Sequence, residues 1–218
     1  MATLLFDFDS TLVRCESLEI LLAKHLHGQP DKMQAIDDLT NRAMNGDMPF
    51  AEALEQRLHI AAPTQQDIRE FCQDQEYWLT EGIAECIQSL HTQHDIWIIS
   101  GGIKEVILPF ADYLNIPENH VHAAQLHWDA HGHFAGINQG EPFSHSKKLG
   151  AEQIALQWHQ QPVVMIGDGM SDYEIFACGL AQHFIAYTEH AARPSVDRVA
   201  TEKAHSPAKL LDVLQRLT

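Results

Sequence analysis

Short apolar runs that end in small or acidic residues recur along this chain. Thr3–Phe8 leads into Asp7-Phe8-Asp9-Ser10-Thr11, and Asp95–Ser100 leads into Gly101-Gly102. A third run, Gln161–Gly167, ends in Asp168-Gly169, and Leu180–Tyr187 is a weaker fourth. Runs of this length and composition are typical of buried parallel strands. The pattern therefore predicts a parallel sheet whose strands end in polar residues.

Helical spacing appears between these runs. Ile83, Ile87 and Leu90 lie on one face of a helix over 82–91. Similar patterns predict helices over 103–114, 146–158, 170–178 and 207–217, the last one starting at Ser206-Pro207. Residues 125–137, with Asp129-Ala130-His131-Gly132 in the middle, predict a hairpin. Strands that alternate with helices indicate an α/β fold in which helices sandwich a Rossmann-like parallel sheet with right-handed crossovers.

One long stretch departs from this alternation. From 16 to 77 every segment has a helical pattern, broken only at Gly28-Gln29-Pro30, Asn45-Gly46 and Ala62-Pro63. A helical stretch placed after the first strand suggests a small inserted cap over the sheet. We therefore expect a catalytic core of 1–14 and 78–218, with an all-helical cap of 15–77.

Composition excludes several classes of function. With 45% hydrophobic and 20% charged residues among 218, the chain is ordinary globular protein. A formal net charge of -16 argues against nucleic acid as a partner, because that affinity depends on clustered Lys and Arg. A phosphorylated small molecule would therefore need a local cationic site.

The sequence also bears on location. It contains no apolar run of about 18 residues, so no membrane span is predicted. The first residues lack a basic region and reach Asp7, which is unlike a signal peptide. Scattered cysteines at 15, 72, 86 and 178 suggest free thiols in a reducing cytoplasm. The pattern does not indicate an oligomeric state.

The polar strand ends are the candidate site. Ligands of open parallel sheets bind beyond the carboxyl ends of the strands, where Asp7, Asp9, Ser100, Asp168 and Asp172 would converge. Clustered carboxylates repel one another unless a cation lies among them, and a set of oxygen ligands favours Mg²⁺ over zinc. Each motif alone is more often a turn or a helix cap. Their joint occurrence at successive strand ends favours a site.

A lysine strengthens this interpretation. Lys147 lies at the start of a predicted helix, where a cation opposes the helix dipole unless an anion is near. Lys148 has the character of an ordinary surface lysine.

These motifs, in this order, resemble those of the haloacid-dehalogenase superfamily. They are Asp7-Phe8-Asp9-Ser10-Thr11-Leu12-Val13, Ile99-Ser100-Gly101-Gly102, Lys147 and Gly167-Asp168-Gly169-Met170-Ser171-Asp172. The resemblance implies that Asp7 attacks phosphorus to form an aspartyl-phosphate, and that Asp9 serves as general acid and base. It implies a Mg²⁺ held by Asp7, the Asp9 carbonyl and Asp168, with Asp172 acting through a water or through Lys147. Ser100, Gly101 and Lys147 would hold the phosphoryl oxygens. Ser171 stands where the family often has Asn, which weakens its assignment as a phosphate contact.

Within the superfamily, the chain resembles the phosphoserine phosphatases. The shared residues are Glu16, the segment Ala43-Met44-Asn45-Gly46-Asp47-Met48-Pro49-Phe50, Arg57 and Thr80-Glu81-Gly82. This implies a cytoplasmic enzyme of serine biosynthesis whose cap opens and closes. Glu16 would bind the substrate ammonium and Arg57 its carboxylate, and Met44 and Phe50 would exclude water.

Alternatives remain open at this point. Glu16 and Arg57 are also the kind of charged residues that any helix surface carries. Another small-molecule phosphatase or phosphotransferase of the same superfamily is a second hypothesis, and an inactive phosphate-binding module is a third. The paired histidines, such as His120/His122 and His131/His133, are predicted to face solvent and not to bind a metal.

Overall fold

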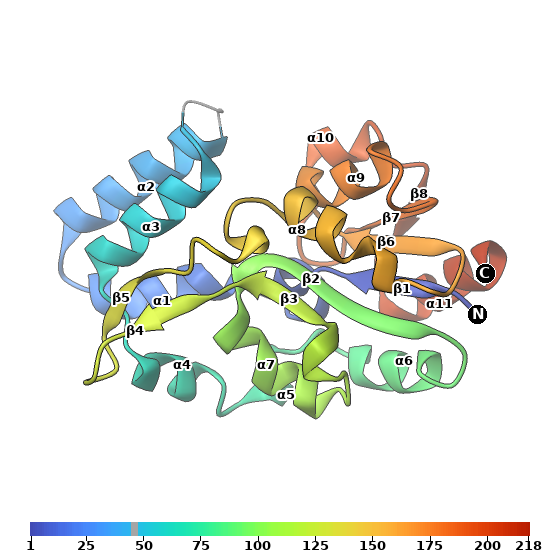
Figure 1. Cartoon of the computed structure of the whole chain (residues 1–218), viewed down its shortest axis with the longest axis horizontal. Coiled ribbons are helices and arrows are strands. Elements are labelled where there is room, and N and C mark those ends of the chain that lie inside the picture. The colour runs from blue at the N-terminus through green and yellow to red at the C-terminus, as the bar shows by residue number, and fades with distance from the viewer. Residues whose placement is uncertain (45–47) are drawn as a thin grey trace.

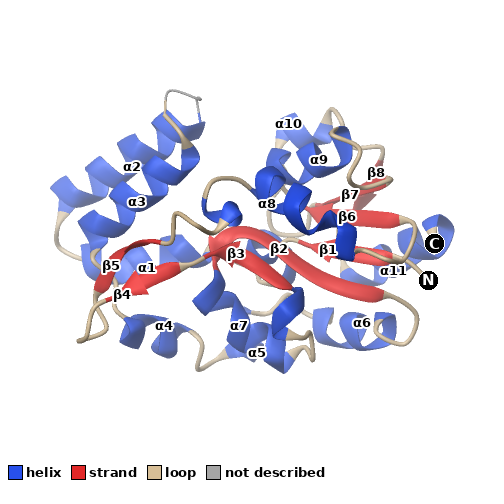
Figure 2. Ribbon diagram, in the orientation of Figure 1, coloured by secondary structure: helices blue, strands red, loops and turns tan. Residues whose placement is uncertain are grey.

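The computed structural model describes residues 1–44 and 48–218, without the side chains at 40, 41, 43, 44 and 50. Within these residues, a parallel sheet of six strands has the order β3-β2-β1-β6-β7-β8. The strands are β1 Thr3–Phe6, β2 Asp95–Ile103, β3 Val121–Ala124, β6 Val163–Gly167, β7 His183–Tyr187 and β8 Glu202–Ala204. Helices cover both faces of the sheet (Figures 1 and 2). The predicted α/β class is confirmed.

Alternation of side chains along each strand divides the core in two. Leu4 and Phe6 point to the face covered by α6 Ile83–Leu90, α7 Lys104–Tyr113 and α11 Pro207–Leu217. Leu5 points to the opposite face, which is covered by α8 Lys147–Ile154 and α9 Met170–Ala177. Because both faces are covered, the central strands carry apolar residues at successive positions, as in Leu4–Phe6, Ile96–Ile99 and Val163–Ile166, and this explains the continuous runs in the sequence.

The helical insert follows the first strand, and its helices α1, α2 and α3 lie beyond the carboxyl ends of the strands (Figure 1). It contains α1 Ser17–Leu26, α2 Pro30–Met44, α3 Phe50–Ala61, α4 Gln65–Phe71 and α5 Gln75–Trp78. Helices α2 and α3 pair with each other, whereas α4 and α5 contact α7 of the core. The domain boundaries expected from the sequence, 15–77, stay a prediction.

The predicted hairpin is present and is attached to this insert. Strands β4 Leu126–Trp128 and β5 Phe134–Ile137 pair antiparallel and form a separate small sheet. The N–H of Gln65 donates to Gly132 O at 2.8 Å, and the N–H of Phe134 donates to Pro63 O at 3.1 Å. The loop between α3 and α4 is therefore bound to the hairpin through its backbone.

One prediction about histidines is wrong for one pair. His120 stacks on Trp97 with ring centroids 4.0 Å apart, and His122 packs between Trp97 and Phe143. Burial lowers the pKa of His122 to about 4, so this ring stays neutral at physiological pH. Both side chains are half-buried and pack on aromatic rings, so they are not the free, solvent-facing residues that were predicted.

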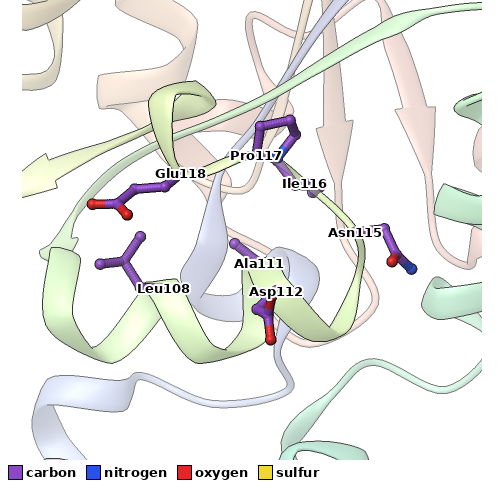
Figure 3. A pocket seen from close by; sticks show the side chains of 7 residues that line it. All are labelled: Leu108, Ala111, Asp112, Asn115, Ile116, Pro117 and Glu118. Carbon is purple, nitrogen blue, oxygen red and sulfur yellow. The ribbon is translucent and has the colours of Figure 1, made fainter.

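A cavity of about 440 Å³ lies where α7 leads into β3, lined by Leu108, Ala111, Asp112 and residues 115–118 (Figure 3). Because α7 follows the carboxyl end of β2 and runs back along the sheet, this cavity lies away from the carboxyl ends of the strands. None of the described helices is long and apolar enough to span a membrane.

Candidate active site

Three carboxylates meet where β1 and β6 end. These strands are neighbours in register, with Phe6 opposite Ile166, so Asp7 lies level with Gly167 and Asp168 follows one residue later. Asp172 joins them from the first turn of α9, and one oxygen from each side chain lies within 4.8 Å of the others. All three side chains are buried. A buried set of carboxylate oxygens at this spacing can hold a hard divalent cation.

Lys147 forms ion pairs with two of these carboxylates. Its Nζ lies 2.9 Å from Asp7 Oδ1 and also contacts Asp172 Oδ1, and its side chain is only 3% exposed. Burial lowers the pKa of the Lys147 ammonium, but the charges of Asp172 and Asp7 more than offset this and raise it above the usual value. The lysine therefore stays charged, as its position at the start of α8 suggested.

Asp9 lies in the tight turn that follows β1. The strand was expected to end between Asp7 and Asp9, but β1 ends at Phe6, one residue before Asp7. The N–H of Asp7 still donates to Ile166 O at 2.9 Å, and the turn begins directly after it. Asp9 Oδ1 accepts from the Ser17 N–H at 2.8 Å. Burial is the main reason why the pKa of Asp9 rises to about 7, with Glu16 and Asp7 adding to it. A carboxyl group with this pKa can both donate and accept a proton near neutral pH.

The turn itself carries backbone strain. Ser10 has a φ of 53°, a left-handed conformation that is costly for a residue with a Cβ. Two bonds hold it there: its N–H donates to Cys15 O at 3.1 Å, and its hydroxyl donates to Glu16 Oε1 at 2.8 Å. The turn is therefore tied to Glu16.

Glycines make room for the acidic groups. A Cβ on Gly167 would lie 2.3 Å from the Asp172 carboxylate, so a side chain there would displace this residue. A Cβ on Gly102 would lie 3.2 Å from Asp9 Oδ2 and 3.3 Å from Ser100 Oγ. The β2–β3 ladder is irregular between Ile99 and Ile103, which places Ser100, Gly101 and Gly102 outside regular pairing.

Arg193 is the second cation of the site. It precedes α10 Pro194–Asp197, and its Nε donates to Asp168 Oδ2 at 2.7 Å while its Nη2 donates to Glu16 Oε1 at 3.1 Å. Burial and the Asp7 charge raise the pKa of Asp168 to about 6, although Arg193 opposes this rise. Any cation close to Asp168 therefore stabilises the ionised form of this carboxylate.

Comparison with known proteins agrees with this geometry. Residues 4–177 match the family model of the haloacid dehalogenase-like hydrolases, which is most of the chain. The chain belongs to this family. Its human relative, a phosphoserine phosphatase, is 34% identical over 194 residues, which covers 88% of this chain and 83% of the relative. A phosphoserine phosphatase of Drosophila melanogaster is 34% identical over 200 residues, covering 89% of this chain and 71% of the relative.

Solved structures of the family have the same fold. A phosphoserine phosphohydrolase-like protein from Francisella tularensis is 39% identical, with a TM-score of 0.87. The match covers 98% of this chain and all of that one, 100%.

The structure describes the other residues predicted from the sequence to different extents. Ser100 is buried and accepts from the Gly102 N–H at 3.1 Å, while Gly101 lies beside it in β2. Ser171 is exposed in the first turn of α9. The side chains of Met44 and Phe50 lie outside the described part of the structure.

Glu16 and Arg57 do not pair with each other. Glu16 contacts Ser10 and Arg193, whereas the buried Arg57 contacts Glu19 of α1. The two residues assigned to the substrate's charges are thus each matched by another side chain. Their assignment stays a prediction.

Sequence reasoning missed Arg193. It lies in Glu189-His190-Ala191-Ala192-Arg193-Pro194, a segment without apolar periodicity or a motif. The available signal was its position: it follows β7, the strand next to β6, at the edge where the other site residues converge.

Proposed function

We propose that this chain hydrolyses O-phosphoserine to serine and phosphate, with Mg²⁺ as its cofactor and Asp7 as the nucleophile. The observation that carries the proposal is the contact of Lys147 with Asp7 and Asp172, beside Asp168, at the carboxyl ends of β1 and β6. Similarity to the human and fly phosphoserine phosphatases supports the choice of substrate.

The donor set fits Mg²⁺. Asp7, Asp168 and Asp172 offer oxygen atoms only, with no thiolate or imidazole among the groups that lie within 4.8 Å of one another in the described residues. Hard oxygen ligands suit Mg²⁺, which would neutralise charge on the transferring phosphoryl group when bound.

Two contacts of Asp7 support its proposed role as the nucleophile. Its Oδ1 accepts from the Phe8 N–H at 2.7 Å and lies near Lys147 Nζ at 2.9 Å. Both contacts use the same oxygen, so they would hold the carboxylate in place and leave Oδ2 to attack the phosphorus, forming an aspartyl-phosphate. Lys147, Ser100 and the Gly101 N–H would hold the phosphoryl oxygens.

Asp9 is the proton donor in this proposal. With a pKa of about 7 it carries a proton for a useful fraction of the time at neutral pH. It would protonate the serine oxygen as that group leaves and later accept a proton from the water that hydrolyses Asp7.

Charged residues of the insert would select the amino acid. Arg57 is 7% exposed, and its guanidinium can bind a carboxylate with two parallel hydrogen bonds. We infer that the substrate carboxylate takes the place of Glu19 on Arg57, and that Glu16 receives the ammonium group. Met44 and Phe50 would form an apolar wall around it, and cap residues 15–77 would close over the bound substrate.

The second candidate is another small-molecule phosphatase or phosphotransferase of the family, since the site around Asp7 would serve any phosphomonoester. An inactive phosphate-binding module is less favoured, because both Asp7 and Asp9 are present.

A substrate panel tests the proposal. With Mg²⁺ present, we expect kcat/KM for phosphoserine to exceed that for glycerol phosphate and sugar phosphates by about 100-fold, because those lack both charges that the site would read. Phosphate release is the measurement, with EDTA-treated enzyme as the control. Equal or faster turnover of a sugar phosphate would overturn the proposed substrate, and full activity in EDTA would overturn the proposed metal.

Replacing Arg57 tests how the substrate is selected. Arg57→Ala should lower kcat/KM for phosphoserine by about 100-fold, mainly through KM, because a charge-assisted bond to the carboxylate is lost. Phosphoethanolamine has the ammonium group but no carboxylate, so its kcat/KM should change little. Arg69→Ala, at an exposed position of α4, serves as the matched control. An equal loss with both substrates would show that Arg57 does not read the carboxylate.

A further inference from the structure

Arg193 connects two parts of the site that have different tasks. One guanidinium donates to Asp168, a proposed metal ligand, and to Glu16, the proposed partner of the substrate ammonium. The two contacts use different nitrogens, Nε and Nη2, so both exist at once. A change in the charge or the partner of either carboxylate therefore alters the interaction of Arg193 with the other.

The backbone near Arg193 is well anchored, but its side chain is not enclosed. His190 Nε2 lies 2.9 Å from the Thr80 hydroxyl, which itself donates to Thr11 O at 2.8 Å. Arg193 O accepts from the Asp197 N–H at 2.9 Å in the turn of α10. The side chain remains 37% exposed. The backbone position of Arg193 is therefore fixed, whereas its exposed side chain has room to move toward solvent.

We propose that Arg193 is a built-in counter-ion that competes with the divalent metal for Asp168 and passes to Glu16 when the metal binds. The inference rests on the proposed function, because it takes Asp168 as a metal ligand. Asp168 is 4% exposed, so its charge is poorly screened by water and requires a cation nearby. The guanidinium and a metal ion would draw on this same carboxylate and repel each other at close range.

The competition has a consequence for substrate binding. When Arg193 leaves Asp168, its whole charge pairs with Glu16. The substrate ammonium must then displace Arg193 from Glu16 in order to bind there. Metal and substrate are thus coupled through one side chain, and Arg193 is a positioning residue without contact to the reacting atoms.

Metal affinity without substrate tests the proposal. We would titrate Mg²⁺ into the 218-residue protein by isothermal titration calorimetry, and compare wild type with Arg193→Gln, which removes the charge and keeps a polar side chain. Loss of the competing cation should tighten Mg²⁺ binding about tenfold. Arg193→Lys keeps the charge and should stay within about threefold of wild type. Arg198→Gln removes an exposed charge five residues away and is the matched control.

A double-mutant cycle of Glu16 and Arg193 separates the effect of their direct contact from the effect of long-range electrostatics on Mg²⁺ binding. Glu16→Gln should weaken Mg²⁺ binding in the wild-type background, because Arg193 then rests on Asp168 alone. In the Arg193→Gln background the same change should have at most half that effect on the logarithm of Kd, whereas a purely long-range field predicts additive effects.

Each result of the titration is decisive. Unchanged affinity in Arg193→Gln overturns the inference. Weaker binding also overturns it, because it would make Arg193 a group that orients Asp168 as a ligand. A wild-type protein that binds no Mg²⁺ would overturn both this inference and the proposed cofactor. Metal binding that responds to Arg193→Gln while phosphoserine is not hydrolysed would leave the inference standing and remove only the proposed substrate.

Discussion

Asp7→Asn should abolish turnover, lowering kcat by on the order of 10⁴-fold or more, because the amide cannot attack phosphorus. The change is nearly isosteric, and the Phe8 N–H can still donate to the remaining oxygen. It also removes one of the like charges that raise the pKa values of Asp9 and Asp168. We therefore expect the fold to remain intact while the chemistry stops.

Rapid-quench labelling shows the missing step directly. Wild-type protein mixed with ³²P-labelled phosphoserine should trap a covalent phosphoprotein, and Asp7→Asn should trap none. Asp31→Asn, in the exposed first turn of α2, is the matched control for the same change of side chain. A variant with more than a tenth of wild-type turnover, or with normal labelling, would contradict Asp7 as the nucleophile.

Asp9→Asn provides a comparison within the same turn. It should lower phosphoserine turnover by roughly 10²–10⁴-fold, since the leaving serine oxygen would have no proton donor. With p-nitrophenyl phosphate, whose leaving group needs no proton, labelling of Asp7 should be much less affected. A loss that is equal for both substrates would assign Asp9 a structural role.

The sheet was largely predictable because its central strands are covered on both faces. β1, β2 and β6 are apolar at successive positions, which gave continuous runs in the sequence. The peripheral strands gave no such signal. β8 has only three residues, Glu202–Ala204, and two of them are charged, while β3 includes His122, whose ring packs on Trp97. Sheet edges depend on neighbours that are distant in the sequence, so local patterns do not reveal them.

The candidate site likewise contains residues that the sequence predicted and residues that it did not. Asp7 and Asp168 directly follow strong strands, so the topology alone brought them together in the prediction. Arg193 follows a strand too, but nothing in its own segment indicated chemistry. The partners of Glu16 and Arg57 could not be predicted from the sequence either, because they depend on how α1 and α3 are oriented and not on residue type. Sequence reasoning found the groups attached to strand ends and missed the contacts between side chains.

Lys147→Met should cause the largest loss of stability of any single change in the site. Lys147 is 3% exposed, and its two partners, Asp7 and Asp172, are 11% and 0% exposed. Removing one member of a buried ionic cluster leaves the others unpaired, which typically costs about 3–5 kcal/mol. For a chain of this size that corresponds to a fall in Tm of roughly 6–15 °C in EDTA. Phosphoserine turnover should fall by roughly 10²–10³-fold as well, since a cation facing the phosphoryl group is lost.

The neighbouring Lys148→Met is the matched control. Lys148 is 44% exposed and its Nζ lies 3.9 Å from Glu152, so its loss should change stability by less than about 0.5 kcal/mol. Equal melting temperatures for the two variants would show that the buried pairs of Lys147 contribute nothing to the fold.

The pH dependence of the deficit separates lost charge from lost packing. Burial already raises the pKa of Asp172 to about 7, and the charge of Lys147 opposes this rise. Without Lys147 the pKa of Asp172 must therefore lie still further above its value in the unfolded chain. A carboxyl group with a raised folded-state pKa favours the folded state at low pH, and this contribution is lost as pH rises through that pKa. A proton can then replace the missing ammonium, and the Tm gap between Lys147→Met and wild type should narrow from pH 8 to pH 5. A gap that stays constant over this range would assign the loss to packing of the lysine side chain and not to its charge.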